Sequence, residues 1–433
     1  MGDEIGEVIW NGAKQETFHA DKNINPLMRN RYFEFVAQTQ IYLVLAACFS
    51  IALSTAFMSL SMGLFVIFWV LSGNFKEKSQ LIRIHPGALI AIALFFLYGI
   101  GMFYSSASWE MRLSWWFKYH KLLYIPMIIS VLTLEKYRNL AFKAFLAGML
   151  MVLAISYLKW LGVVPHKDIG QGYFVFKGRI AHNIFMAFTM YLTLHLAVKS
   201  SDVKRWIWIG VSFLAAMNIL FLVNGRSGQI IMLVLLVWFF WETWRWKSIQ
   251  CLTILTVAIG AIYFLSNDLP ESRLMEIRQE IMRHDPSQAP TSSGLRLEFY
   301  KNAIKLIQQN PLFGGGTGSF ENEYRVLAET QKTVSTYVPN PHNEFLLTGQ
   351  ELGAVGLLLL LAFFVVPWSL SYRLATTGKS DEYYGYALRG LVMSMVVGSL
   401  FNSLLLDAGE GKFYCVLAGV FLSAYQPTKK QQQ

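Results

Sequence analysis

Long apolar runs, separated by short polar segments, dominate the chain from Val36 to Tyr425. The runs approach twenty residues, which is about the length a helix needs to cross a bilayer core of about 30 Å. They are continuous rather than alternating at every second residue, and this favours helices over the strands of a barrel. Inside a bilayer, only helices or closed barrels satisfy every backbone N–H and C=O. The pattern therefore predicts an all-α, polytopic integral membrane protein.

Segmentation of these runs predicts about twelve transmembrane helices. Their centres lie near residues 43, 66, 95, 125, 150, 190, 214, 234, 257, 358, 396 and 418. The predicted parts are an N-terminal segment (1–32), helices one to nine (33–266), an outer loop (267–341), helices ten to twelve (342–425) and a tail (426–433). Because a polar segment precedes the first run, we expect that run to stay as an anchor rather than to be cleaved as a signal peptide.

The distribution of Lys and Arg predicts the orientation. The terminal segments and the loops on their side carry more of these residues than the short loops on the opposite side. The positive-inside rule therefore places both termini in the cytoplasm and the loop 267–341 on the outer face. The net charge of +10 at pH 7 is explained by this topology. No nucleic-acid partner is expected, and membrane lipids are the expected surroundings.

The loop 267–341 is the one large segment predicted outside the membrane. It contains amphipathic helical patterns at 271–283 and 295–309, separated by a Pro-, Ser- and Thr-rich break at 284–294. The segment "NPLFGGGTGSF" (310–320) follows. Its glycines favour a hinge or turn, while close approach of the backbone to a glycan or phosphate is the alternative. A loop of this length is usually either functional or disordered, and its periodicity favours an ordered, docked helix.

Four basic residues stand at the outer ends of predicted spans or in the outer loop. They are Arg179 in "FKGRIAHNIF", Arg226 in "LVNGRSGQI", Arg296 in "SSGLRLEFY" and His342 in "YVPNPHNEFLLTGQELG". The predicted topology brings all four to the same water–membrane boundary. A charge near a bilayer is costly unless it is paired or solvated, so such residues are candidates for function.

Each candidate also has a structural interpretation, and both interpretations stay open. Arg179 can be an interfacial anchor whose charge reaches the headgroups. Arg296 can belong to a solvated helix face, and His342 or the nearby His182 can be a packing residue. Arg226 is harder to explain in this way, because flanking glycines leave the backbone open around the cation. Only the four residues as a set favour function.

Together, three arginines and one histidine fit chemistry on a diphosphate. Guanidinium is permanently charged and presents a planar fork that matches phosphate oxygens. A diphosphate leaving group gains negative charge as its bond breaks, and fixed cations lower that barrier. The chain contains no D-x-D carboxylate pair of the kind that holds Mg²⁺ in many glycosyl transfers. Arginines can act in its place, so no metal and no cofactor are expected. His342, with an ordinary pKa of about 6.5, can act as a general base.

The ordered segments "GRIAHN", "NGRSGQ", "SSGLR…NPLFGGGTGSF" and "PNPHNEFL…ELGAVGLL" resemble those of the bacterial O-antigen ligases. The resemblance covers essentially the whole chain, with its specific motifs between residues 178 and 356. It implies an inverting, metal-independent glycosyl transfer at the periplasmic face of the inner membrane. The implied donor is O-antigen linked to undecaprenyl diphosphate. The implied acceptor is a sugar hydroxyl of the lipid A–core oligosaccharide, and the product is complete lipopolysaccharide.

The resemblance also implies roles for individual residues. His342 would be the base or the acceptor-activating residue, and Arg226 and Arg296 would engage the diphosphate. We extend the diphosphate role to Arg179. Further residues near these positions are candidates for a supporting role: His182, Asn183, Asn343, Glu344 and Asp407.

Alternatives from the same superfamily are O-antigen polymerases and protein O-oligosaccharyltransferases. The latter usually carry more sequence after the last span than the few residues that follow Tyr425 here. A transporter of lipid-linked glycans is a reading from a different class. Transporters often show repeated halves and polar breaks near the bilayer midplane. This chain shows no obvious repeat and concentrates its polar residues at one face.

Overall fold

The computed structural model of the protein describes residues 26–165, 172–223, 225–245, 292–331, 335, 337–377 and 381–425. These residues are almost entirely helical, and one isolated antiparallel bridge joins Gly172 to Val223. The predicted all-α class agrees with this part of the chain. The predicted amphipathic helix at 271–283 and the span near 257 lie outside the described residues.

Most of the described chain is divided among α-helices of very different lengths. In chain order they are α2 (Pro26–Ser50), α3 (Thr55–Leu71), α4 (Phe75–Arg83), α5 (Pro86–Gly101), α6 (Trp109–Lys118), α7 (Tyr124–Val131), α8 (Glu135–Trp160), α9 (Arg179–Lys199), α10 (Asp202–Met217), α11 (Arg226–Trp244), α14 (Ser292–Gln309), α15 (Phe320–Gln331), α16 (Glu344–Thr377), α17 (Asp381–Ser399) and α18 (Ala408–Leu422). A 3-10 helix, η1 (His120–Leu123), precedes α7, and a π-helix, η2 (Asn218–Leu222), follows α10.

Six helices in the described part of the chain are long and apolar enough to cross a membrane. They are α2, α8, α9, α10 with η2, α11 and α16. A seventh span is formed if α3 and α4 are taken together, although they are bent by 114° at the break between them. The other predicted spans that fall within the described residues coincide with shorter or more polar helices, such as α5, α7 and α18. A multi-pass membrane protein is therefore supported, while the number of twelve spans and the outer loop stay predictions.

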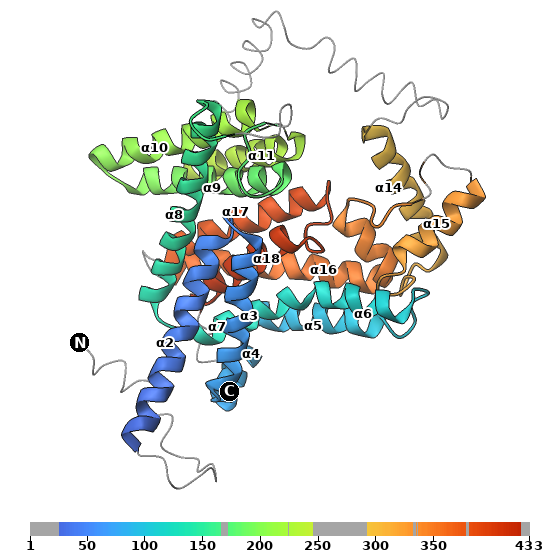
Figure 1. The fold of residues 1–433 in the computed structure, drawn as a ribbon, viewed down its shortest axis with the longest axis horizontal. Coiled ribbons are helices and arrows are strands. Elements are labelled where there is room, and N and C mark those ends of the chain that lie inside the picture. The colour runs from blue at the N-terminus through green and yellow to red at the C-terminus, as the bar shows by residue number, and fades with distance from the viewer. Residues whose placement is uncertain are drawn as a thin grey trace, which may run out of the picture.

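The helices pack in groups around α16 and α9. Helix α16 lies along α17 and α5, whereas α9 packs against α10 and α11, and α2 packs against α3 and α8 (Figure 1). Helices α14 and α15 pack on each other and against one end of α16 (Figure 1). Local capping fixes where some helices begin. The side chains of Ser54 and Ser108 accept backbone N–H groups of α3 and α6, and Pro86 occupies the first turn of α5.

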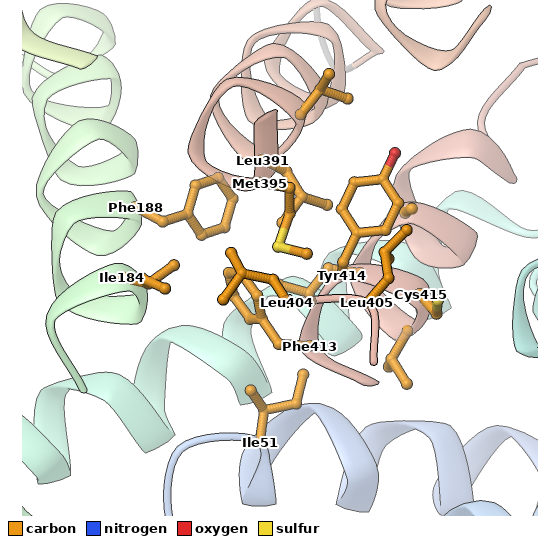
Figure 2. Packing of buried hydrophobic residues seen from close by; sticks show 14 of the residues in the cluster. Ile51, Ile184, Phe188, Leu391, Met395, Leu404, Leu405, Phe413, Tyr414 and Cys415 are labelled. Carbon is orange, nitrogen blue, oxygen red and sulfur yellow. The ribbon is translucent and has the colours of Figure 1, made fainter. Parts of the chain in front are cut away.

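The core is apolar and fully buried where α9, α17 and α18 meet. Figure 2 shows Ile184 and Phe188 of α9 facing Met395 of α17 and Phe413 of α18, all with almost no exposed surface. Cys48 and Cys415 are buried as free thiols. They occupy the core as small apolar side chains.

Helix α16 is broken at Gly353, which has φ 62° and ψ −154°. The segment 311–316 packs into this break through four backbone hydrogen bonds. Gly315 and Gly316 donate to the carbonyls of residues 350 and 351, at 2.7 and 2.8 Å. Ala354 and Val355 donate to the carbonyls of residues 311 and 312, at 2.8 and 3.3 Å. The glycine-rich segment is thus a turn fixed to α16.

Candidate functional site

His342 stands two residues before α16 with an uncommon backbone conformation, φ 53°. Its N–H donates to Oδ1 of Asn340 at 2.9 Å, and its carbonyl accepts the hydroxyl of Tyr300 at 3.3 Å. A left-handed conformation at a non-glycine residue costs on the order of 1–3 kcal/mol, and such residues cluster at functional sites. The two hydrogen bonds hold the histidine in this conformation at the head of the helix.

Helix α14 brings Arg296 beside His342. The rings of Phe299, on the same helix, and His342 have centroids 6.2 Å apart. Burial lowers the pKa of His342, and the positive charge of Arg296 lowers it further. The imidazole is therefore neutral at neutral pH and has a nitrogen lone pair available to accept a proton. The charge of Arg296 therefore acts on the imidazole of His342.

Asn343 caps α16. Its Oδ1 accepts the N–H groups of Phe345 and Leu346, each at 3.0 Å, as expected for asparagine at an N-cap. Its Nδ2 donates to the carbonyl of Leu400 at 3.0 Å, just beyond the end of α17. The hydroxyl of Tyr300 donates to the same carbonyl at 2.8 Å. Asn343 therefore supports the position of its neighbour His342 by fixing the helix end and the adjacent chain.

Glu344 is completely buried one residue further on. Its Oε2 accepts the backbone N–H groups of Leu405 and Leu406 at 2.8 and 3.3 Å, and its Oε1 accepts the hydroxyl of Tyr119 at 3.4 Å. The carboxylate thus holds the segment that leads into α18. Two of these contacts are with the backbone of that segment and the third is with the side chain of Tyr119, and none is with the imidazole of His342.

Arg179 and Asp407 line one pocket of about 410 Å³, together with Glu410 and Phe174. Arg179 is the exposed first residue of α9, and Asp407 is the residue that precedes α18. The pocket therefore combines one guanidinium with two carboxylates. Within the described residues, no three His, Cys, Asp or Glu side chains form a group suited to a metal ion.

Arg226 is the exposed first residue of α11, and the flanking glycines serve helix packing. A Cβ atom at Gly225 would lie 2.4 Å from Nδ2 of Asn183, and one at Gly228 would lie 2.3 Å from its Cβ. Nδ2 of Asn183 also donates to the carbonyl of Val223 at 3.1 Å. The sequence interpretation, an open backbone around the cation, thus gives way to close contact between α11 and α9. Asn183 supports the start of α11.

His182 lies in a buried polar network. Its Nδ1 accepts the N–H of Val175 at 3.3 Å, so Nε2 carries the proton and donates to Oδ1 of Asn218 at 2.8 Å. Nδ2 of Asn218 donates to Ser156 at 2.8 Å, and Ser156 donates to the carbonyl of Tyr173 at 2.6 Å. This is the packing role that the sequence left open for His182.

The beginnings of α9, α11 and α16 lie at one end of the helix bundle. A Cβ atom at Gly398, near the end of α17, would lie 3.3 Å from Ile231 and 3.7 Å from Ile184. These isoleucines belong to the second turns of α11 and α9, whose first residues are the two exposed arginines. Two residues after Gly398, the carbonyl of Leu400 bonds to Asn343. The four candidate basic residues therefore share one end, in two places: the Arg296–His342 pair, and the first turns of α9 and α11.

Two residues that shape the surroundings of His342 were not singled out from the sequence. Asn340, between the two prolines of the "PNP" segment, also accepts the hydroxyl of Ser403 at 3.1 Å. Tyr300 lies one turn after Arg296 on the buried side of α14. The "PNP" turn chemistry could have suggested the first residue, and the helical spacing from Arg296 could have suggested the second.

The O-antigen ligase family model matches residues 211–361, which include Arg226, Arg296 and His342. A relative, an uncharacterized protein of Haemophilus influenzae, is 22% identical over 254 residues. That similarity covers 57% of this chain and 63% of the relative, so the chain spans less than two thirds of the relative's length. The match over residues 211–361 and the segments quoted above agree: this part of the chain is similar to the O-antigen ligase family.

Proposed function

We propose that the protein is a ligase that transfers O-antigen polysaccharide from undecaprenyl diphosphate to a sugar hydroxyl of lipid A–core. The reaction takes place at the periplasmic face of the inner membrane, with both termini in the cytoplasm, and it inverts the anomeric centre without a metal. The observation that carries the proposal is the docking of α14 beside the half-buried His342. The Phe299 and His342 ring centroids are 6.2 Å apart, and the charge of Arg296, on the same helix, acts on the imidazole.

In the proposed step, His342 accepts the proton of the acceptor hydroxyl. The freed oxygen attacks the anomeric carbon of the donor from the face opposite the diphosphate, and the bond from that carbon to the diphosphate oxygen breaks. The electron pair of that bond leaves with undecaprenyl diphosphate. Arg296, Arg226 and Arg179 stabilise the negative charge that builds on the leaving group, because a guanidinium keeps its charge at any physiological pH.

The exposure of two of the three arginines supports their proposed role at the leaving group. Arg179 and Arg226 are exposed at the first residues of α9 and α11, where a substrate can reach them. The positive ends of the two helix dipoles add to their charge. Both substrates are lipids, so an enzyme embedded in the membrane avoids moving either into water.

A reconstituted assay with purified donor and acceptor lipids in detergent tests the function. We expect His342→Ala to abolish transfer with no loss of folded protein, and Arg226→Lys to impair it severely because the planar fork is lost. Arg205→Lys, an exposed arginine of α10 at the opposite end of the bundle, is the matched control. Wild-type turnover in His342→Ala would remove the base assignment. Inhibition by EDTA that Mg²⁺ reverses would overturn the metal-independent mechanism.

The acceptor distinguishes a ligase from the polymerases of the same superfamily. Loss of a ligase leaves bare lipid A–core and long lipid-linked chains, whereas loss of a polymerase leaves core that carries a single repeat. Gene deletion followed by lipopolysaccharide electrophoresis separates the two outcomes. A protein acceptor in the purified assay would point to an O-oligosaccharyltransferase instead.

A further inference from the structure

A second pocket, of about 270 Å³, adjoins the Arg179 pocket, and Ala408 lines both. Four basic residues contribute to its wall: Lys118 at the end of α6, His120 and Lys121 in η1, and Lys412 in α18. No carboxylate side chain lines it among the described residues. The proposed mechanism uses none of these four residues, so their convergence needs a separate explanation.

Two of the three lysines of this pocket are fixed by neutral oxygen atoms. Lys121 is 1% exposed, and its Nζ donates to the carbonyls of Leu406 and Asp407 at 3.0 and 2.7 Å. Lys412 is 7% exposed, and its Nζ donates to the hydroxyl of Ser59 at 2.6 Å. An ammonium has three N–H donors, so each lysine keeps at least one for a further acceptor.

The charges of these lysines have little direct compensation. None of them takes part in a salt bridge with the residues that the structure describes. The carboxylates of Glu344, Asp407 and Glu410 act on Lys121 electrostatically, and those of Asp407 and Glu351 act on Lys118. None of these four carboxylates lines the pocket. Lys118 is exposed, and its Nζ lies 4.1 Å from the centroid of the Trp115 ring. Several ammonium groups around one small pocket favour a ligand with more than one negative charge.

An exposed apolar stripe leads along α6 to the pocket. Trp109, Leu113 and Phe117 are spaced four residues apart, so they lie on one face of the helix, and they are 55%, 44% and 67% exposed. Phe117 also lines the pocket. A soluble anion would make no use of this stripe. A lipid with an anionic head could place its chain along α6 and its head among the lysines.

We propose that this pocket, the lysine pocket, binds the phosphate group of a lipid substrate at a site separate from the Arg296–His342 pair. The inference rests on the proposed function, which involves two phosphorylated lipids: the polyprenyl diphosphate donor and an acceptor built on phosphorylated lipid A. The chemistry shared by both is a phosphate ester attached to an apolar chain. Under this proposal, the side chains of Lys118, Lys121 and Lys412 bind the phosphate group of the substrate.

Binding measurements on the full-length protein in phosphatidylcholine nanodiscs test this assignment. The probes are undecaprenyl diphosphate, phosphorylated lipid A and lipid A from which the phosphates have been removed. We expect Lys118→Gln and Lys412→Gln each to weaken binding of one phosphorylated probe about tenfold, because each removes a charge-assisted hydrogen bond. Lys412→Arg, which keeps the charge, should restore most of the binding. Lys301→Gln, in an exposed lysine of α14, is the control.

The identity of the affected probe tells which substrate occupies the pocket. Weaker binding of phosphorylated lipid A alone assigns the acceptor, and weaker binding of undecaprenyl diphosphate alone assigns the donor. Unchanged binding of both, or an equal loss for lipid A without phosphates, would overturn the proposal. Because binding is measured without turnover, a lysine effect combined with full activity in His342→Ala would refute the proposed mechanism and leave the lysine pocket standing.

Discussion

The buried carboxylate of Glu344 accepts the backbone N–H of Leu405 at 2.8 Å. Through this bond, the head of the helix that follows His342 is joined to the segment that leads to Asp407 and the start of α18. The two candidate pockets beside α18 depend on that segment, because Leu406 lines one and Asp407 the other. A residue without contact to the imidazole therefore holds together two parts of the candidate site.

Removal of the Glu344 carboxylate should loosen this segment. Glu344→Ala leaves the buried N–H groups of Leu405 and Leu406 without an acceptor, at a cost of about 1–3 kcal/mol for each group. We expect a lower unfolding temperature and faster hydrogen exchange at these two amides. Glu344→Gln should lose less because it keeps one acceptor oxygen, and Glu329→Ala, in an exposed residue of α15, should change neither quantity. Loss of transfer with normal melting and exchange would point instead to a direct chemical role.

The pH dependence of transfer should depend on the pair Arg296–His342. Burial and the charge of Arg296 lower the pKa of His342, so the neutral base persists below the ordinary value of about 6.5. The acid limb of kcat/KM against pH should therefore lie below that value. Arg296→Gln removes the positive charge that disfavours the imidazolium, so the pKa of His342 should rise and the limb should move to higher pH. An acid limb at the same pH in this variant would contradict the assignment of His342 as the base.

The break at Gly353 should tolerate no side chain. A Cβ atom there would lie 2.3 Å from the carbonyl carbon of Leu312, and the φ of 62° is unfavourable for other residues. Gly353→Ala should therefore destabilise the protein by more than about 1 kcal/mol and expose the segment 311–316 to proteases. Gly210→Ala is the control, because nothing lies within 4 Å of its added Cβ in the middle of α10. Equal melting temperatures for the two variants would show that the break is not rigid.

A buried ion pair at the opposite end of the bundle should contribute far more to stability than an exposed one. Arg389 donates from Nε to the Glu242 carboxylate, and their side chains are 3% and 7% exposed. Arg389→Met leaves that carboxylate without its guanidinium, and the expected cost is about 3–5 kcal/mol. Lys199 and Glu382 form a bridge of 2.9 Å with both side chains 34% exposed, so Lys199→Met should cost less than about 1 kcal/mol. Denaturant titrations in detergent measure both.

The double variant is the sharper test of the buried pair. In the Arg389→Met background, replacing Glu242 by Leu removes the carboxylate that the first substitution left without its guanidinium. Stability should then recover in large part. A double variant as unstable as Arg389→Met would show that the arginine acts through packing with Tyr372 and Tyr386, whose rings lie 4.6 and 4.8 Å from its guanidinium carbon.

Local patterns in the sequence predicted the elements that depend on local spacing. The amphipathic period at 295–309 became α14, within a few residues of the expected bounds, because that period is set within the helix itself. Arg296 lies beside His342 because α14 docks on α16. The sequence predicted that both residues lie at the same water–membrane boundary, but not that they are neighbours. The predicted spans near 125 and 418 correspond to α7 and α18, which are shorter than a full membrane crossing because loops and a 3-10 turn replace part of each run.

The sequence did not predict the features that depend on contacts between distant segments of the chain. The break at Gly353 exists because the segment 311–316 supplies hydrogen-bond partners to both sides of it. Within the apolar run, that glycine resembles any other in a transmembrane helix. The lysine pocket likewise joins residues from α6, η1 and α18, which the sequence treats only as scattered cations of the short loops.

The insertion of residues 311–316 into α16 restricts where the protein can open. Four backbone hydrogen bonds hold this segment across the break. An outward movement of the segment would have to break all four. The segment that joins α14 to α15 is therefore fixed to α16 along this edge. We therefore expect the O-antigen chain of the proposed reaction to enter and leave on another side of the protein.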